Sequence, residues 1–206
     1  MNYPMKRGKF VVIEGIDRAG KSTQCKLIQE KLGWKVIEFP NRSTPTGKLI
    51  DAHLKREVRF SNETFHLLCS ANRWEMMAEI KELLLFGTNI ICGRYAYSGV
   101  AYSHAKGMDF DWCKNPDIGL IKPDLVIFLD VGAEVAASRG DFGKEIYEKI
   151  DFQKKVRKSF LKVLDILDFE GFKLVHGSTS IDRDHETIMD LLEHMKEPKE
   201  LKELWK

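Results

Sequence analysis

Gly15-Ile16-Asp17-Arg18-Ala19-Gly20-Lys21-Ser22 has the form G-x-x-x-x-G-K-[ST]. It follows a strand-like apolar run at 10–14 and precedes a helix-like run that ends at Gly33. A glycine-rich loop in this position lets backbone N–H groups converge on an anion, and the helix N-terminus adds partial positive charge. In such loops the lysine reaches the β- and γ-phosphates and the hydroxyl residue binds Mg²⁺. The stretch therefore predicts a phosphate-binding loop at the start of an α/β domain.

Short apolar runs alternate with longer helical patterns along the rest of the chain. Strands are predicted at 10–14, 35–39, 89–92, 125–129 and 173–175, and helices at 62–86, 150–169 and 184–195. Strands that are apolar on both faces are typical of a buried parallel sheet. We therefore expect a three-layer α/β fold, with a five-stranded parallel sheet and helices on both faces. Residues 1–206 are predicted to form a single domain, with a charged, loosely docked tail at 197–206.

The composition is that of a charge-balanced protein without an extended basic surface. Lys and Arg number 33 and Asp and Glu number 31, which argues against non-specific binding of nucleic acid. Four scattered cysteines without a C-x-x-C pair indicate reduced thiols rather than a disulfide framework or a zinc site. No run resembles a signal peptide or a membrane span, so we expect no membrane association and a cytoplasmic, or by diffusion nuclear, location.

Arginines occur where a second anion would lie. Arg42 and Arg94 follow the second and third predicted strands, and Arg73 lies in the long helix at 62–86. Ligands of parallel sheets bind beyond the carboxyl ends of the strands. Any one of these arginines alone is better explained as a solvated surface residue. Together they indicate a second anionic site beside the phosphate loop.

Phosphate-loop proteins differ in what receives the phosphoryl group. A GTPase needs N-K-x-D after a later strand, and Lys114-Asn115-Pro116-Asp117 does not have that order. A small-molecule kinase needs a second pocket and a cover that excludes water. The glycine-hinged, charged stretch at 139–149 is interpreted as such a lid, although an ordinary surface loop explains it equally well.

In its motifs the chain resembles the thymidylate (dTMP) kinases of the eukaryotic and poxviral type, which belong to the P-loop nucleoside monophosphate kinases. The resemblance spans nearly the whole chain. It depends on Gly15 to Thr23, Phe39-Pro40-Asn41-Arg42-Ser43, Gly47-Lys48-Leu49, Ser70-Ala71-Asn72-Arg73-Trp74-Glu75, Arg94 to Tyr102, Lys122-Pro123-Asp124-Leu125-Val126 and Glu203-Leu204-Trp205-Lys206. It implies transfer of the γ-phosphate of ATP to dTMP, giving dTDP, with Mg²⁺, in a homodimer packed through helices.

The resemblance also implies roles for residues on the donor side. The catalytic group would be Arg18, Lys21, Asp17 and Arg94, with Arg18 bridging the donor and acceptor phosphates as an arginine finger in cis. Ser22 would hold the metal, and Arg139 would stack on adenine. The full ATP-binding set implied is Gly15, Arg18, Ala19, Gly20, Lys21, Ser22, Thr23 and Arg139.

On the acceptor side, Arg42 and Arg94 would clamp the dTMP phosphate through charge-assisted bonds. Arg73 would donate to a thymine carbonyl, and Tyr102 would crowd the 2′ position of the sugar. Asp17 would accept from the 3′-hydroxyl. The full dTMP-binding set implied is Asp17, Phe39, Arg42, Leu54, Arg73, Arg94, Ser98, Gly99, Tyr102 and Tyr147. Without the resemblance, Leu54, Ser98 and Tyr147 are better explained by packing or surface roles.

Two positions depart from the family pattern. Gly93 stands where the family has an aspartate implicated in Mg²⁺ positioning or as a base, so we expect reduced kcat with retained nucleotide binding, and a higher kcat in Gly93→Asp. Cys69 stands where a phenylalanine commonly stacks on thymine, so we expect weak dTMP affinity, with Phe65 as a core residue. Two alternatives therefore stay open: a catalytically impaired nucleotide-binding protein, and a kinase with relaxed pyrimidine monophosphate preference.

Overall fold

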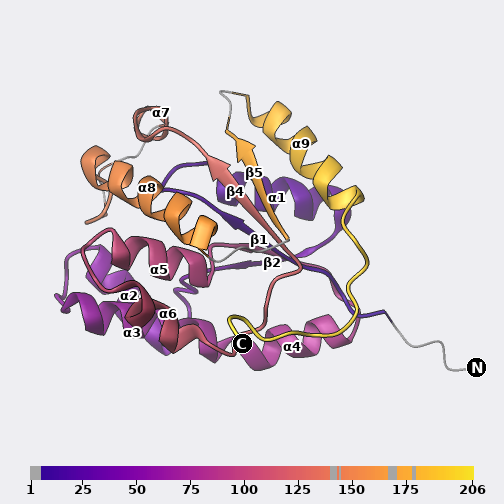
Figure 1. Ribbon diagram of the computed structural model, residues 1–206, viewed down its shortest axis with the longest axis horizontal. Helices are drawn as coiled ribbons and strands as arrows, with labels where there is room; N and C mark the ends of the chain where they lie inside the picture. Colours follow the sequence, from indigo (N-terminus) through magenta and orange to yellow (C-terminus); the bar gives the residue numbers. More distant parts are fainter. Residues whose placement is uncertain (1–5, 140–142, 144, 167–170, 178–179) are drawn as a thin grey trace, which may run out of the picture.

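The structure is a computed structural model that describes residues 6–139, 143, 145–166, 171–177 and 180–206. It contains one sheet of five strands, all parallel, in the order β2-β3-β1-β4-β5 (Figure 1). The strands are β1 (Phe10–Glu14), β2 (Lys35–Glu38), β3 (Ile90–Gly93), β4 (Leu125–Asp130) and β5 (Phe172–His176). The predicted α/β fold and its five strands are confirmed, with boundaries that differ by one residue at most.

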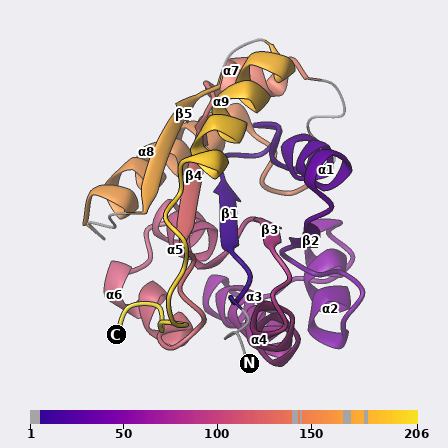
Figure 2. The ribbon, with the colours of Figure 1, turned by 90° about the vertical axis from the view of Figure 1, so that its right-hand side faces the viewer.

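The described helices connect these strands and cover the sheet. They are α1 (Lys21–Leu32), α2 (Pro45–Leu54), α3 (Asn62–Glu75), α4 (Met77–Leu85), α5 (Ala96–His104), α6 (Phe110–Lys114), η1 (Asn115–Asp117), α7 (Ala133–Ala137), α8 (Ile150–Ile166) and α9 (Ile181–Glu193). Helices α1 and α9 lie together along one face of the sheet, and α5 and α8 pack against each other on the other face (Figures 1 and 2). All five residues of β1 are buried between these layers.

The long helix expected at 62–86 is wrong as a single element. Its backbone breaks at Met76, which ends α3 and precedes α4. The two helices bury different surfaces: α3 buries polar groups such as Arg73 beside a cavity, whereas α4 places Ile80 and Leu84 in the main core. The sequence has no glycine or proline at the break, so periodicity alone could not locate it.

The ends of two other helices also differ from expectation. Helix α9 begins at Ile181, earlier than the predicted 184, because the Ser180 side chain accepts a hydrogen bond from the Arg183 amide and caps the first turn. It ends at Glu193 rather than 195. Helix α8 extends to Ile166, and the remainder of the predicted 150–169 helix lies outside the described residues.

The carboxyl-terminal tail is firmly packed, and the expectation of loose docking is wrong. Leu204 is buried, and its backbone pairs with Gly119 and Leu120 at 3.0 and 2.7 Å. The Trp205 ring meets Tyr97 edge-on, with the ring centroids 5.8 Å apart. Apolar side chains between charged ones thus anchor a segment whose average composition is polar.

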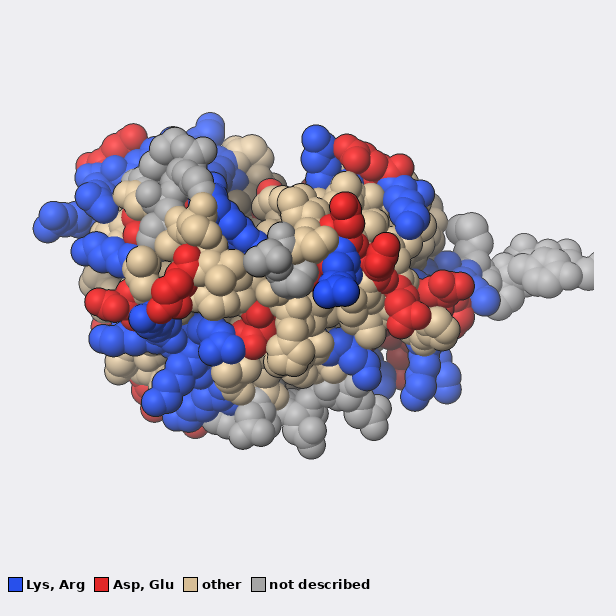
Figure 3. Space-filling model, turned by 90° about the horizontal axis from the view of Figure 1, so that it is seen from above, with Lys and Arg blue, Asp and Glu red and all other residues tan. Residues whose placement is uncertain are grey.

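The surface mixes charges of both signs. Viewed from above the orientation of Figure 1, basic and acidic side chains are interspersed over the molecule (Figure 3). Within the described ranges, no helix has the length and apolar character needed to cross a membrane. Cys25, Cys69, Cys92 and Cys113 are all free thiols.

Candidate active site

The phosphate loop joins β1 to α1, and its glycines are required by geometry. Gly15 has φ 152°, and a Cβ there would lie 2.9 Å from the Leu129 carbonyl oxygen. Gly20 has φ 103° and precedes α1 without a capping side chain. The first amides of α1 are therefore left without a side-chain acceptor, as an anion-binding helix N-terminus requires.

Lys21 is buried at the start of α1. Its Nζ donates to the Ile16 carbonyl oxygen at 2.6 Å, which folds the side chain back over the loop. Burial, together with the nearby Arg94 guanidinium, lowers the pKa of Lys21 to about 7. An anionic ligand would restore the ammonium form because it supplies the missing counter-charge.

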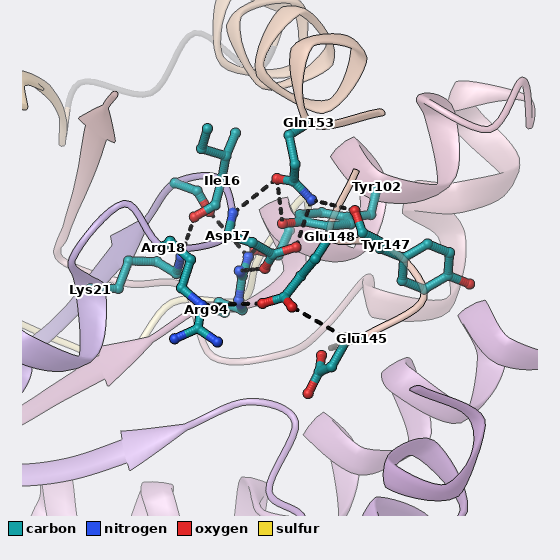
Figure 4. Close-up of polar contacts among 12 residues, drawn as sticks. Ile16, Asp17, Arg18, Lys21, Arg94, Tyr102, Glu145, Tyr147, Glu148 and Gln153 are labelled. Atoms are coloured by element: carbon teal, nitrogen blue, oxygen red, sulfur yellow. Dashed lines mark hydrogen bonds and ion pairs between the residues drawn. The ribbon is translucent and has the colours of Figure 1, made fainter. Parts of the chain in front are cut away.

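Arg94 follows β3 and lies next to the phosphate loop (Figure 4). Its guanidinium forms a short ion pair with Asp17 and donates to the Gly15 carbonyl oxygen at 3.1 Å. It also lies 5.2 Å from the centre of the Tyr102 ring. One cation is thus fixed between the loop and the neighbouring strand end.

Glu14 explains how Arg94 is positioned. This fully buried carboxylate accepts from the Tyr95 amide at 2.8 Å and from the amide and hydroxyl of Ser98. It therefore ties the segment after β3 to the end of β1. Burial raises the pKa of Glu14, against the lowering effect of these hydrogen bonds and of Arg94.

Gln153 was not anticipated from the sequence. It is fully buried at the start of α8, where its amide donates to Asp17 at 2.6 Å and to the Tyr147 carbonyl at 2.9 Å (Figure 4). Its oxygen accepts from the Asp17 amide at 2.9 Å. A glutamine inside a helical pattern carries no sequence signal for this role, since its partner is 136 residues away.

Arg18, on the same loop, contacts the segment expected to be a lid. Its Nε pairs with Glu148 at 3.1 Å, and Arg139 donates to the Arg18 and Ala19 carbonyls at 3.2 and 2.9 Å. Both Arg18 and Arg94 have a positive φ, 61° and 66°. Left-handed arginines are strained, and such strain gathers at functional sites.

A cavity of about 260 Å³ opens beside this loop. Its lining comes from the phosphate loop and the start of α1, from strand ends, from α2, α3 and α5, and from Lys106, Glu145 and Tyr147. The lining residues are Asp17, Lys21, Ser22, Glu38, Phe39, Pro40, Arg42, Ile50, Leu54, Phe65, His66, Cys69, Arg73, Gly93, Arg94, Tyr95, Ser98, Gly99, Tyr102, Ser103, Lys106, Glu145 and Tyr147. The lining combines cations with aromatic and apolar groups, which suits a ligand that joins a phosphate to a flat ring.

The family model for thymidylate kinase matches residues 13–188. This chain belongs to the thymidylate kinase family. It is 46% identical to the thymidylate kinase of Schizosaccharomyces pombe, over 92% of this chain and 93% of that one. It is 47% identical to that of Plasmodium falciparum over the full length of both. The solved thymidylate kinase of Candida albicans has 38% sequence identity and a TM-score of 0.91, covering 96% of this chain and 98% of its own.

Every residue expected to bind the acceptor nucleotide in a thymidylate kinase lines the cavity here. Of the expected ATP-binding residues, Lys21 and Ser22 line it. The others expected on the donor side, Gly15, Arg18, Ala19, Gly20, Thr23 and Arg139, lie along or against the phosphate loop outside the lining set.

The base end of the cavity, where the acceptor nucleobase is expected, has a fixed cation. Arg73 makes two hydrogen bonds to Asp117, Nε to Oδ1 at 3.0 Å and Nη2 to Oδ2 at 2.6 Å, and both side chains are buried. Its guanidinium packs against Gly99, where a Cβ would lie 2.8 Å away. Asp117 was not anticipated, because only the folded chain brings it to Arg73.

Around Cys69 the cavity contains aromatic groups and a second cation. Phe65 belongs to a small apolar cluster with Ile50 and Leu54, as expected of a core residue, and also lines the cavity. The Lys106 ammonium donates to the Tyr147 hydroxyl at 2.7 Å and lies 5.0 Å from the Phe65 ring centre. Burial lowers the pKa of Lys106 to about 8.

Arg42 lies at the mouth of the cavity, between two carboxylates. It pairs with Asp51 at 2.5 Å and with Glu145 at 2.6 Å, and 43% of its side chain is exposed. Both carboxylates make charge-assisted contacts with the Arg42 guanidinium, so an anionic ligand would have to replace them to bind it.

Oxygen donors for a metal ion are present, although they do not form a closed site. Within the described ranges, no group of three or more His, Cys, Asp or Glu is arranged to hold a metal. Ser22 and Glu38 line the cavity at its phosphate-loop end. This donor set fits Mg²⁺, which prefers oxygen ligands and keeps part of its coordination for water and nucleotide phosphates.

Proposed function

We infer that this protein transfers the γ-phosphoryl group of ATP to dTMP and gives dTDP and ADP. Family membership, through relatives 46% and 47% identical over almost the whole chain, is the observation that carries this conclusion. The cavity supports it, because its lining offers cations for a phosphate and aromatic and apolar side chains for a base.

On the donor side, the amides of residues 19–23 would hold the phosphates of ATP, with the Lys21 ammonium on the β- and γ-phosphates. Mg²⁺, when bound, would neutralise charge on these phosphates, and the Ser22 hydroxyl would be one of its ligands. Arg139 would stack on adenine; its hydrogen bonds to the loop carbonyls place it beside this site.

The transferred group would lie between Lys21 and Arg94. Arg18 would bridge the donor and acceptor phosphates once it leaves Glu148, and Arg42 and Arg94 would grip the acceptor phosphate. Phosphoryl transfer has a loose transition state, in which positioning and charge stabilisation dominate. Arg94, paired with Asp17, would supply positioning, and Arg18 and Arg42 would add positive charge once substrate phosphates replace their carboxylate partners.

Nucleoside recognition would use the opposite end of the cavity. Arg73, oriented by Asp117, would donate to a thymine carbonyl between the walls formed by Phe39 and Leu54. Asp17 would accept from the 3′-hydroxyl and Tyr102 would exclude a 2′-hydroxyl. Ser98, Gly99 and Tyr147 would complete the acceptor site.

We propose that residues 139–149 act as a lid within a single domain. Residues 140–142 and 144 lie outside the described residues. The described part contacts both substrate sites: Glu148 pairs with Arg18, Glu145 pairs with Arg42, and the Ile146 amide donates to the Leu54 carbonyl at 3.2 Å. Substrate phosphates would replace these carboxylates and draw the lid over the reacting groups.

Relaxed acceptor preference is a second candidate function. Cys69 fills less of the base site than an aromatic ring, and the cavity has a second cation, Lys106, for base carbonyls. The solved Candida albicans relative is described as having broad substrate specificity. The pyrimidines thymine, uracil and cytosine all present a ring carbonyl oxygen to such cations.

A homodimer packed through helices stays a prediction from the resemblance. Leu67 and Trp74 are 47% and 43% exposed, and their seven-residue spacing puts them on one face of α3. Sedimentation of the pure protein tests this assembly. The cytoplasmic or nuclear location also stays a prediction.

A coupled assay of ADP release with Mg²⁺-ATP and dTMP, dUMP, dCMP or dGMP tests the proposed function. Turnover that is fastest with dTMP supports it. Comparable rates with several acceptors favour the relaxed preference. No turnover with any of them, together with tight ATP binding, would identify a non-catalytic nucleotide-binding protein.

A further inference from the structure

Of the four adjacent strands β2, β3, β1 and β4, three end in a carboxylate at the carboxyl edge of the sheet and one does not. The last residues of β1, β2 and β4 are Glu14, Glu38 and Asp130, whereas β3 ends at Gly93. This edge faces the phosphate loop, where phosphate-binding enzymes place a carboxylate for Mg²⁺. A carboxylate that binds a metal ion here must not already be engaged by other groups of the protein.

Two of the three are already engaged. Glu14 is fully buried and accepts hydrogen bonds from Tyr95 and Ser98. Asp130 forms a two-point ion pair with Arg157, at 2.6 and 2.7 Å. Neither belongs to the residues that line the cavity.

Glu38 differs from these two carboxylates in its partners and in its position. It is exposed, lines the cavity together with Lys21 and Ser22, and makes no side-chain hydrogen bond or ion pair with the rest of the described chain. An exposed carboxylate that lines the cavity and has no protein partner is available to a cationic ligand such as Mg²⁺.

Glu38 also occupies the space that a side chain at position 93 would use. The two residues are register partners in β2 and β3. A Cβ on Gly93 would lie 3.3 Å from Glu38 Cγ, 3.4 Å from Glu38 Oε1 and 3.6 Å from Cys25 Sγ. Cys25 is one turn after Lys21 in α1, so this carboxylate flanks the first turn of α1.

We propose that Glu38 is the carboxylate that positions Mg²⁺ on the bound nucleotide, in place of a side chain at the end of β3. This inference rests on the proposed phosphate-loop site. Mg²⁺ is commonly held by one or two carboxylates together with substrate phosphates and water, and Glu38 and the Ser22 hydroxyl supply oxygen donors within one cavity.

The proposal changes the expectation for Gly93→Asp. An aspartate there would crowd Glu38 and set two carboxylates side by side, which disfavours ionisation of both. The single substitution should therefore give little gain. The same aspartate should position Mg²⁺ when Glu38 is replaced by the neutral glutamine.

The test uses Glu38→Gln, Gly93→Asp and the double variant, with Glu79→Gln as a control at an exposed glutamate of α4. Binding of Mn²⁺ to the enzyme with ADP is followed by electron paramagnetic resonance, and binding of ADP alone in EDTA by calorimetry. Glu38→Gln should weaken Mn²⁺ binding about tenfold or more, as loss of a group that orients a metal typically does, and leave binding of ADP in EDTA unchanged. The double variant should recover Mn²⁺ affinity.

Mn²⁺ affinity in Glu38→Gln equal to that in Glu79→Gln would overturn the inference while leaving the proposed function intact. A loss of ADP affinity in EDTA as large as the loss of Mn²⁺ affinity would also overturn the inference, because Glu38 would then act on the phosphate loop rather than on the metal. Absence of ADP binding to the unaltered enzyme would instead contradict the proposed nucleotide site itself.

Discussion

Arg73 and Asp117 form a two-point ion pair in which the guanidinium side chain is 4% exposed and the carboxylate 0%. The Ser70 hydroxyl donates to the same carboxylate at 2.7 Å. Burial opposes the charge on Arg73, and Asp117 raises the pKa of Arg73 and keeps it cationic. The pair therefore fixes a cation at the base end of the cavity.

Asp117→Asn should destabilise the protein and weaken dTMP binding together. It leaves a buried guanidinium without its counter-charge, which costs about 3–5 kcal/mol of unfolding free energy. Urea denaturation and calorimetry with dTMP measure the two effects. Asp111→Asn, at an exposed residue paired with Lys114, is the control and should change stability by less than about 0.5 kcal/mol. Equal effects of the two variants would refute this role of the ion pair.

Cys69→Phe should tighten dTMP binding. A restored stacking ring is worth about 1–3 kcal/mol, or roughly five- to 150-fold in affinity. Titration calorimetry with dTMP gives the dissociation constant, and Cys69→Ala, which adds no ring, should leave it unchanged. No gain in Cys69→Phe would mean that Phe65 and Tyr147 already supply the stacking surface.

Arg42→Met should raise the KM for dTMP with little effect on ADP binding. Loss of charge-assisted hydrogen bonds to a phosphate costs about 1.5–3 kcal/mol, which corresponds to roughly ten- to 150-fold. Steady-state kinetics measures KM, and Arg59→Met, at an exposed arginine outside the cavity lining, is the control. An unchanged KM would show that Arg42 does not bind the acceptor phosphate and pairs only with Asp51 and Glu145.

Lys106→Met should make the protein more stable at neutral pH. Because burial lowers the pKa of Lys106 from 10.5 to about 8, the unfolded chain binds more protons between these values. Unfolding free energy of the unaltered protein therefore rises with pH through that window. The variant should gain up to about 3 kcal/mol at pH 7, and the gain should disappear above the unfolded pKa.

Urea denaturation at a series of pH values measures this difference. Lys48→Met, at an exposed lysine of α2, should show no such trend. A variant less stable than the unaltered protein at neutral pH would show that the contacts of Lys106 with Tyr147 and Phe65 outweigh the cost of burying its charge.

The sequence predicted the parts of the site that depend on local order. The phosphate loop, the five strands and the arginines after two strand ends follow from spacing and from the geometry of parallel sheets. The resemblance added Leu54, Ser98 and Tyr147, which line the cavity although their own sequence contexts suggest packing or surface roles.

The missed residues depend on contacts between distant segments. Gln153 reaches Asp17 across 136 positions, and Asp117 reaches Arg73 across 44. The role proposed for Glu38 depends on its register with Gly93, which the sequence alone does not show. The break at Met76 and the packing of Leu204 were likewise decided by tertiary contacts, against local composition.

A crystal structure with a bisubstrate mimic, in which adenosine and thymidine are joined through a chain of phosphates, tests the central claim most directly. The account predicts the Lys21 ammonium and the Arg94 guanidinium within hydrogen-bond distance of the same phosphate bridge, with the thymine ring beside Arg73. Density for the mimic with either cation beyond a side chain's reach of that bridge would contradict it.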